Sequence, residues 1–481
     1  METFGAAGGL AHSKEFQAVI LCGSGAKLFP LIDDNCPKAL LPLANKPMLF
    51  YQLEWLETAM INDILIVCQE EAHKKINNYI HNVLNVSERY PNAKVEVIKS
   101  KGSGTSSADA LRLVANRIKT DFIVLSCDTI TNYPPNKLLD VFRIQSPTFT
   151  ALFHEPLKAE GEVASSKSKD DDLIEYVAID HSTCRLLFSV AGDEVDDELP
   201  VRMSILDKFP VVNIHTKLRD AHLYVFKHWV IDFLSKSKIQ SIKEELIPLL
   251  THFQYSEKVL KREGVEKYLK AGGLSYDEFY TSRHQSSTGG GFVNATYSQS
   301  MHEHYLRQNL HNPPSTASST ILLDDVEDDE VTTDFHKHIV CTALVAKEGY
   351  CFRVNSVPNY LEGSRALIKT ITPEELVPRS VERAKGCQVG DSLVGDSCRV
   401  GEKTSIKKSV IGNHCVIGKN VKIINSVLHD HCVIEDKAVL EGTVVCANSK
   451  VLEMCNLKDC QVASGVSIEK EVQGKNETFI D

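Results

Sequence analysis

A turn with two glycines follows the first apolar run of the chain. Residues 16–22 (FQAVILC) have the composition of a buried strand, and Gly23 and Gly25 come shortly after them. Glycine lets a backbone approach a ligand closely, and the N–H groups of such a turn can point at an anion. The sequence therefore predicts a phosphate-binding loop at the end of the first strand.

Two further segments have residues with possible chemical roles. Asp128 follows the apolar run 122–125 in the segment LSCDT, where an aspartate also suits a turn or a helix cap. The segment KGSGTSSADAL at 101–111 predicts a glycine-serine turn before a helix that is capped by Thr105 or Ser106.

Alternating strands and helices must position these residues. The apolar periods predict strands at 18–22, 63–68, 95–98 and 122–125, and helices at 47–60, 70–84 and 106–118. Such alternation is typical of a mostly parallel sheet with covered faces, in a Rossmann-like α/β fold. Ligands of these sheets bind beyond the carboxyl ends of the strands, where the CGSG turn would lie.

Composition argues against several classes of function. The 481 residues have a formal net charge of −11, which disfavours a general affinity for nucleic acid. No apolar run has the length of a signal-peptide core or a membrane span, so we expect a cytosolic protein and reduced thiols for its 14 cysteines. The pairs His414–Cys415 and His431–Cys432 could suggest zinc, but no four-ligand spacing accompanies them, and small buried core residues are the alternative.

A low-complexity stretch interrupts the chain at 283–337. It runs from QSSTGGG through NPPSTASST to the acidic DDVEDDE, and it has too little apolar surface to offset the entropy lost on ordering. We expect a disordered insertion there, a mobile loop at 164–172 and a flexible tail at 1–15. The acidic run could dock on a basic partner or serve as a solvated tether.

The C-terminal part has a repeat of 17 residues. Apolar positions recur at intervals of 5, 6 and 6 residues from Val389 to Ile468, so three short strands would complete one turn of a triangular solenoid. Cys398, Cys415 and Cys432 keep the same spacing and should stack in a ladder. Five turns at ~4.8 Å predict a prism about 24 Å long, with flat faces and an open end that suit partner binding. Its Val-Gly and Ile-Gly pairs resemble the hexapeptide repeat of left-handed parallel β-helices.

The beginning of the chain resembles the sugar-nucleotide nucleotidyltransferase family, whose loop GGxGTRLxPL is followed by PKxLLPxxxKPM. The second motif is intact here from Pro37 to Met48. CGSGAKLFPL is one residue shorter than the first, with Ala26 and Lys27 in place of threonine and arginine. A lysine keeps the positive charge but loses the planar fork that grips a phosphate in fixed geometry.

The resemblance also implies a pair of carboxylates on magnesium, and one of them is replaced. In that family an aspartate that matches Asp128 holds the metal, and a second lies in a WxDxG segment. A gapless alignment back from Tyr360 and Leu361 places Arg353 at the second aspartate. A guanidinium in a cation-binding position predicts that catalysis is absent, with no catalytic residue, no metal and no cofactor. A relic nucleotide pocket would consist of Gly23, Gly25, Lys27, Lys38 and Asp128, with Lys27 as a weak phosphate contact.

A nucleotidyltransferase-like domain followed by a hexapeptide β-helix is the layout of GDP-mannose and ADP-glucose pyrophosphorylases. It is also the layout of the gamma and epsilon subunits of eukaryotic translation initiation factor 2B. The altered loop, the segment RDAHLYVFKHWV at 219–230 and an end at Asp481, without the helical exchange domain of epsilon subunits, resemble the gamma-subunit family.

That resemblance implies a non-catalytic, structural and regulatory subunit of the guanine-nucleotide exchange factor for initiation factor 2. The implied partners are an epsilon subunit homologue in a heterodimer, the alpha, beta and delta subunits of the same complex, and translation initiation factor 2, with no direct nucleic acid contact. The alternatives are an active sugar-nucleotide pyrophosphorylase that uses Asp128 and magnesium, and a nucleotide sensor that binds GTP without turnover.

The predicted organisation has two folded parts. The α/β domain occupies 16–282 and is completed by 338–383 after the insertion. The β-helix follows at 384–470, with a tail at 471–481.

Overall fold

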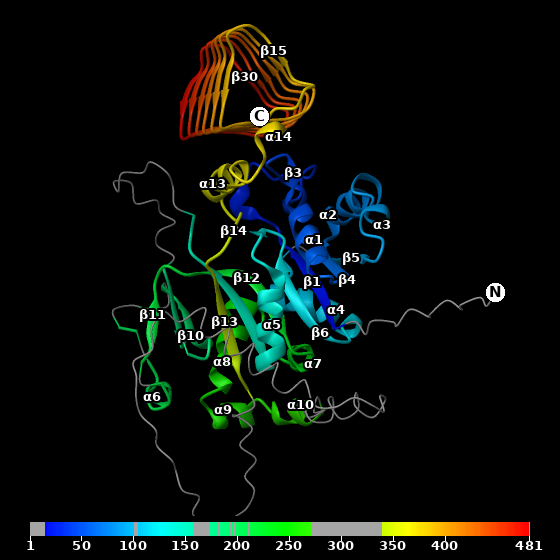
Figure 1. The fold of residues 1–481 in the computed structure, drawn as a ribbon, viewed down its shortest axis with the longest axis vertical. Coiled ribbons are helices and arrows are strands. Elements are labelled where there is room, and N and C mark those ends of the chain that lie inside the picture. Colours follow the sequence, from blue (N-terminus) through cyan, green and yellow to red (C-terminus); the bar gives the residue numbers. More distant parts are fainter. Residues whose placement is uncertain are drawn as a thin grey trace, which may run out of the picture.

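The structure is a computed structural model in which an α/β domain is followed by a triangular coil of short strands (Figure 1). It describes residues 15–100, 104–157, 174–180, 182–192, 195, 198–199, 201–209, 211–271 and 339–480. The predicted insertion at 283–337, the predicted loop at 164–172 and the first 14 residues of the predicted tail lie outside the described residues.

The first part of the α/β domain is a parallel sheet with helices between its strands. These elements are β1 (Phe16–Cys22), α1 (Met48–Thr58), β4 (Asp63–Gln69), α2 (Glu70–Asn78), α3 (Val86–Arg89), β5 (Lys94–Ser100), α4 (Ser107–Val114) and β6 (Asp121–Ser126). β1 lies between β4 and β6 and is parallel to both. Because alternate residues of a strand point to opposite faces, Ala18 packs into one apolar cluster and Val19 into another. Burial on both faces explains the continuous apolar run, and the predicted Rossmann-like fold is confirmed.

Short turns connect or extend these elements. They are the 3-10 turns η1 (Ala26–Leu28), η2 (Lys38–Leu40) and η4 (Ala115–Arg117), the π turns η3 (Tyr79–Val83) and η7 (Ile242–Leu246), and the strand pair β2 (Pro42–Leu43) and β3 (Lys46–Pro47).

Later strands widen this sheet to ten within the described residues, in the order β11-β9-β10-β13-β8-β12-β6-β1-β4-β5. The added strands are β8 (Phe149–His154), β9 (Glu175–Asp180), β10 (Arg185–Ala191), β11 (Asn213–His215), β12 (Arg219–Phe226) and β13 (Cys341–Ala346). The accompanying helices are α5 (Pro135–Gln145), α6 (Met203–Leu206), α7 (Trp229–Lys236), α8 (Ile247–Phe253), α9 (Glu257–Arg262) and α10 (Glu266–Ala271). β13 pairs in parallel with β8, so the chain returns to the same sheet after the insertion and completes the α/β domain.

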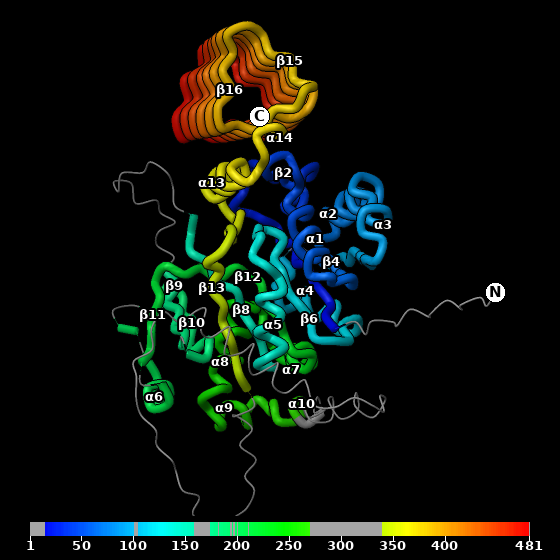
Figure 2. The backbone as a smooth tube through the Cα atoms, viewed as in Figure 1, coloured from blue at the N-terminus to red at the C-terminus, as the bar shows by residue number. Residues whose placement is uncertain are grey.

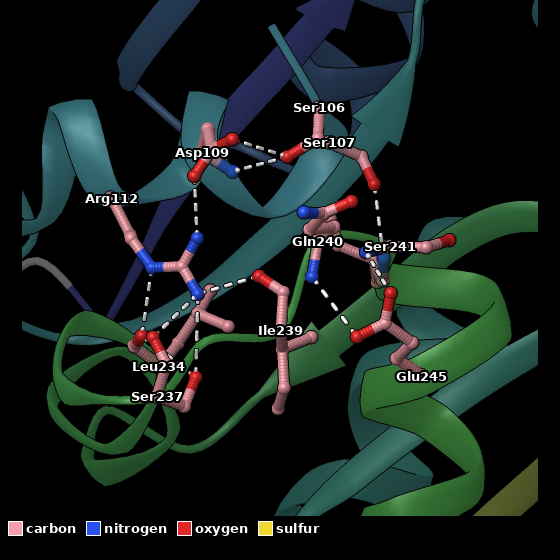
Figure 3. A network of polar contacts seen from close by, with 11 residues as sticks. Ser106, Ser107, Asp109, Arg112, Leu234, Ser237, Ile239, Gln240, Ser241 and Glu245 are labelled. Carbon is pink, nitrogen blue, oxygen red and sulfur yellow. Dashed lines mark hydrogen bonds and ion pairs between the residues drawn. The ribbon is translucent and has the colours of Figure 1, made fainter.

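The start of α4 is fixed by a polar network (Figure 3). The Ser106 hydroxyl accepts a hydrogen bond from the Asp109 N–H at 3.2 Å, so Ser106 is the predicted helix cap. Arg112 donates to the carbonyl oxygens of Leu234, Ser237 and Ile239. This network joins the turn at 104–106 to the connection that follows α7.

The coil has three flat faces, each a parallel sheet of six strands (Figure 2). The first face contains β15 (Glu382–Arg383), β18 (Arg399–Val400), β21 (Val416–Ile417), β24 (Val433–Ile434), β27 (Lys450–Val451) and β30 (Ser467–Ile468). The second contains β16 (Gln388–Gly390), β19 (Ser405–Lys407), β22 (Lys422–Ile424), β25 (Val439–Glu441), β28 (Asn456–Lys458) and β31 (Gln473–Lys475). The third contains β17 (Leu393–Val394), β20 (Val410–Ile411), β23 (Val427–Leu428), β26 (Val444–Val445), β29 (Gln461–Val462) and β32 (Thr478–Phe479).

The repeat of 17 residues is confirmed, but its predicted end is wrong. Val389 pairs with Ile406, and Ile406 with Ile423, each 17 residues on. The coil continues into the predicted tail at 471–481 as far as Phe479, because β31 and β32 pair with the preceding coil. The inward position of β31 is Gly474, which breaks the apolar pattern, and a Cβ there would lie 3.0 Å from the Phe479 ring. The Phe479 side chain therefore lies beside the inward position of β31, where Gly474 leaves room for it.

The α/β domain and the coil share one apolar cluster, and residues of α13 (Val357–Ile368) belong to it. The next helix, α14 (Pro373–Leu376), leads into the coil. The Tyr360 hydroxyl donates to the Pro42 carbonyl oxygen at 2.6 Å and lies 2.8 Å from Nε2 of His429. Burial lowers the pKa of His429 to about 4, so the ring is neutral at pH 7. Because the Tyr360 hydroxyl proton is donated to Pro42, the contact with His429 requires the tautomer whose Nε2–H donates to Tyr360. Asn45 Nδ2 donates to the Ile411 carbonyl oxygen at 2.8 Å.

Among the helices of the described residues, none has the length and apolar content that crossing a membrane requires.

Tyr360→Phe should lower the free energy of unfolding by about 1–3 kcal/mol, because two buried partners on different domains lose the hydroxyl. Urea unfolding followed by circular dichroism measures this change. The matched control is Tyr51→Phe, which removes one hydrogen bond to the Leu43 carbonyl within the α/β domain and should have a smaller effect. Equal losses in the two variants would contradict a special role for the Tyr360 contact.

Candidate functional site

The glycine loop begins where β1 ends. Gly25 has a φ of 73°, and a Cβ added to it would lie 2.6 Å from Cδ1 of Ile32 and 3.0 Å from Cδ of Lys38. This position therefore requires glycine, both for the backbone conformation and for the close approach of Lys38. Gly23 is different, since a Cβ there would meet nothing within 4 Å.

The centre of the site is the carboxylate of Asp128, which is fully buried at the end of β6. Lys38 Nζ lies 2.7 Å from Oδ2, and Arg353 Nη2 lies 2.9 Å from the same oxygen. Arg353 Nε also donates to Oδ1, at 3.4 Å. The Lys38 and Arg353 side chains are only 10% and 19% exposed, so water screens these ion pairs weakly.

Three distant segments bring these charges together. Lys38 opens η2 after the extended Pro37. Arg353 ends β14 (Cys351–Arg353), which pairs antiparallel with β7 (Thr129–Thr131) and places Arg353 opposite Thr129. The Val354 N–H then donates to the Asp128 carbonyl oxygen at 2.9 Å, so the main chain holds the guanidinium beside the carboxylate.

The site has one negative charge between two positive charges. Burial alone would raise the pKa of Asp128, but the Arg353 guanidinium and the Lys38 ammonium outweigh burial and hold that pKa well below its ordinary value. The carboxylate therefore stays ionised at neutral pH. Two cations therefore flank the one carboxylate of Asp128, and the Asp220 carboxylate also acts on Arg353.

Not every predicted site residue joins this group. Lys27 is exposed on η1, and among the described residues no hydrogen bond or ion pair joins it to Asp128 or Lys38. Gly23 is also exposed, at the start of the loop. In the part of the chain that the structure describes, no group of three or more His, Cys, Asp or Glu side chains has the arrangement to hold a metal ion.

Sequence reasoning missed a buried acidic group on β12. Asp220 accepts hydrogen bonds from the Tyr224 hydroxyl and the His222 N–H, and its own N–H donates to Glu175 at 3.0 Å. Lys243 lies 2.5 Å from the other Glu175 oxygen. Burial and the Glu175 carboxylate raise the pKa of Asp220 to about 6. The group depends on a register shift in β12 at a left-handed His222, which the alternating pattern of RDAHLYVF does not reveal.

The fold and site define a class of protein. Residues 17–160 match the family model described as nucleotidyl transferase. Residues 376–473 match a second model, described as the left-handed β-helix domain of eIF2B subunit epsilon. The chain therefore has a nucleotidyltransferase domain with a Rossmann-like sheet and a C-terminal left-handed β-helix.

Comparison with curated proteins narrows this class to one family. The chain is 36% identical to the translation initiation factor eIF2B subunit gamma of Schizosaccharomyces pombe over 397 residues, which cover 82% of this chain and 72% of the relative. It is 29% identical to the gamma subunit of Dictyostelium discoideum, over 82% of this chain and 84% of the relative. The epsilon subunit of the same organism is 27% identical over 43% of this chain and 29% of its own length. The chain belongs to the family of eIF2B gamma subunits.

Asp128→Asn should lower the free energy of unfolding by about 3–5 kcal/mol at pH 7, because it leaves two buried cations without a counter-charge. Urea unfolding measures the loss. The matched control is Glu70→Gln, which breaks an exposed ion pair with Lys99 at 2.9 Å and should cost less than about 1 kcal/mol. If the two variants lose the same stability, the buried charges are not what holds this region together.

The same carboxylate should make stability depend on pH. Its pKa is lower in the folded chain than the value of about 3.9 expected in the unfolded chain, so its contribution is complete above about pH 5 and is lost progressively as the pH falls further. Unfolding free energies between pH 6 and pH 3 should therefore fall less steeply for Asp128→Asn than for the unchanged protein. Identical slopes would show that Asp128 titrates alike in both states.

Proposed function

We propose that this chain is a non-catalytic, structural and regulatory subunit of a guanine-nucleotide exchange factor. The observation that carries the proposal is the ion pair between Arg353 and Asp128. Nucleotidyl transfer in related enzymes needs two carboxylates that neutralise a magnesium ion. Here the second position holds a guanidinium, and Asp128 binds that guanidinium and an ammonium.

The residues present do not fit a magnesium ion. Magnesium requires oxygen ligands at 2.0–2.1 Å in a nearly octahedral arrangement. Asp128 Oδ2 is already shared by Lys38 and Arg353, and a divalent cation near that oxygen would face two positive charges in a buried site. These residues therefore support no metal-assisted step.

The pocket around Asp128 is then a relic of nucleotide binding. Of the five predicted residues, Lys38 contacts Asp128 and Gly25 lies against Lys38, while Gly23 and Lys27 are exposed on the loop. The two cations beside Asp128 support retention of some affinity for an anion without turnover.

The assembly partners are proposed from the relatives' names and the shared layout. The gamma and epsilon relatives are both named as eIF2B subunits, and similarity to both supports a heterodimer between this chain and an epsilon-type chain. That pair would join alpha, beta and delta subunits and act on translation initiation factor 2 in the cytosol. The rigid prism and its junction at α13 would supply binding surfaces.

Arg353→Asp should create the missing carboxylate and a divalent cation site. Calorimetric titration with Mn²⁺ should show at least ten-fold tighter binding to this variant than to the unchanged protein, because two carboxylates replace an ion pair. The control is Arg353→Lys, which keeps the positive charge and should gain no affinity. Circular dichroism verifies folding, and equal Mn²⁺ affinity in the unchanged protein would contradict the proposed loss of the metal site.

Co-expression with an epsilon-type chain should give a one-to-one heterodimer by native mass spectrometry, and the purified chain should not convert GTP and mannose 1-phosphate to GDP-mannose. Recovery as a homo-oligomer that forms GDP-mannose would overturn the proposed function.

A further inference from the structure

A cleft of about 710 Å³ lies at the edge of the sheet where β1, β4 and β5 begin. Asp128 follows the end of β6, which is parallel to β1, so the cleft and the ion pairs of Asp128 lie at opposite edges of the sheet. Figure 1 shows the edge with the cleft on the side away from the coil. The volume of the cleft lies within the range of about 300–1,000 Å³ that is typical of small-molecule sites.

The floor of the cleft is apolar. It consists of side chains that α1, the starts of two strands and the connection before β5 contribute to the core of the domain, namely Phe16, Leu53, Ile61, Ile64 and Tyr90. All five residues are buried, so their side chains are held in place by the packing behind them. A ring or a hydrocarbon body that lies on this floor would leave water, which favours its binding.

The rim of the cleft is negative. Arg143 is the one cation among the described residues that line it, and its guanidinium donates to both carboxylate oxygens of Glu15, at 2.8 and 2.9 Å, and to Asp140 at 2.8 Å. Glu57, near the end of α1, and Asp63, at the start of β4, add two further carboxylates. The C-terminal end of α1 is also the negative end of its helix dipole. The rim therefore favours a cation and disfavours an anion.

Met60 lies at this rim in a conformation that is rare for its residue type. It has a φ of 56°, in the left-handed region where glycine usually ends a helix, and its side chain is 84% exposed. The Met60 N–H donates to the Glu57 carbonyl oxygen at 2.8 Å, and a glycine could make the same bond without exposing apolar surface. The flexible thioether can instead cover an occupant of the cleft, as methionine does at other binding surfaces.

We propose that this cleft binds a small organic cation. Its flat apolar body lies on the floor, its charged group faces Glu57 and Asp63, and Met60 covers its outer side. Charge complementarity carries this assignment, because the cation of the lining is already neutralised by Glu15 and Asp140 while the other two carboxylates remain to face the ligand. The proposal does not depend on the proposed subunit role, since no residue of the lining belongs to the group around Asp128.

The first test compares two probes of the same shape and opposite charge. Benzamidine joins a benzene ring to an amidinium cation, and benzoate joins the same ring to a carboxylate. Calorimetric titration of the full chain at pH 7 should show at least ten-fold tighter binding of benzamidine. Equal affinity for the two probes, or no binding of benzamidine, would overturn the proposal.

A pair of charge variants locates the bound cation. Glu57→Gln keeps the shape of the side chain but removes one charge from the rim, so it should weaken benzamidine binding about five-fold. Glu71→Gln is the matched control, because Glu71 is exposed on α2 and does not line the cleft. If both variants bind benzamidine as tightly as the unchanged protein, the cation does not lie beside Glu57 and the assignment fails.

A pair of methionine variants separates binding from backbone strain. Met60→Gly should raise the midpoint of thermal unfolding, because glycine adopts a positive φ readily, and should weaken benzamidine binding at the same time. Met454→Gly is the matched control, since Met454 is 50% exposed on the coil with a φ of 61°. It should raise the midpoint and leave binding unchanged. Unaltered benzamidine affinity in Met60→Gly would contradict the covering role of Met60.

A further probe distinguishes a small ligand from a protein partner. N-acetylarginine amide has a planar cation on a flexible chain and no ring, so it should bind the full chain at least five-fold more weakly than benzamidine in the same titration. Binding as tight as that of benzamidine would assign the cleft to an arginine side chain of a partner protein and overturn the small-molecule assignment.

Discussion

A carboxylate that is buried away from water must have counter-charges, and this requirement determines how several segments of the α/β domain meet around Asp128. Burying the ionised Asp128 alone would cost several kcal/mol, so the fold has to deliver cations to it. One cation comes from Lys38, near the start of the chain, and the other from Arg353, beyond the insertion. The β7–β14 pair, the short η2 turn and the required glycine at position 25 all serve this convergence. The arrangement that would disable a metal site is thus also what lets the site stay folded.

The same stretch of chain links the ion pairs to the junction of the two domains. Only three residues separate Arg353 from Val357, where α13 begins, and α13 carries Tyr360 into contact with both domains. The neutral His429 ring and the shared apolar cluster continue this contact into the coil. One short stretch of chain therefore positions both the ion pairs of Asp128 and the contact between the two domains.

Most of the fold could be predicted because the spacing of apolar residues along the chain indicates the type of each element. The apolar runs of β1, β4 and β6 indicate burial on both faces, and the spacing of 17 defines the coil. The last strands were missed because Gly474 and Phe479 exchange volume across the coil, which removes the apolar signal from its usual position. At the site, a family motif indicated Asp128 and Arg353, but no pattern in the sequence shows that they touch. The contact with Lys38 and the acidic group at Asp220 arise only from tertiary packing and a shift in β12.

The place of β13 in the sheet has a consequence for how the chain is made. β13 lies between β10 and β8, so the middle of the sheet stays open until residue 346 has been synthesised. About 190 residues separate the end of β8 from that point, which at 5–20 residues per second is on the order of 10–40 s of translation. During that interval β8 has an unpaired edge, and Asp128 lacks Arg353. Until β13 is made, the nascent chain therefore presents an unpaired strand edge, and such an edge can pair with another chain.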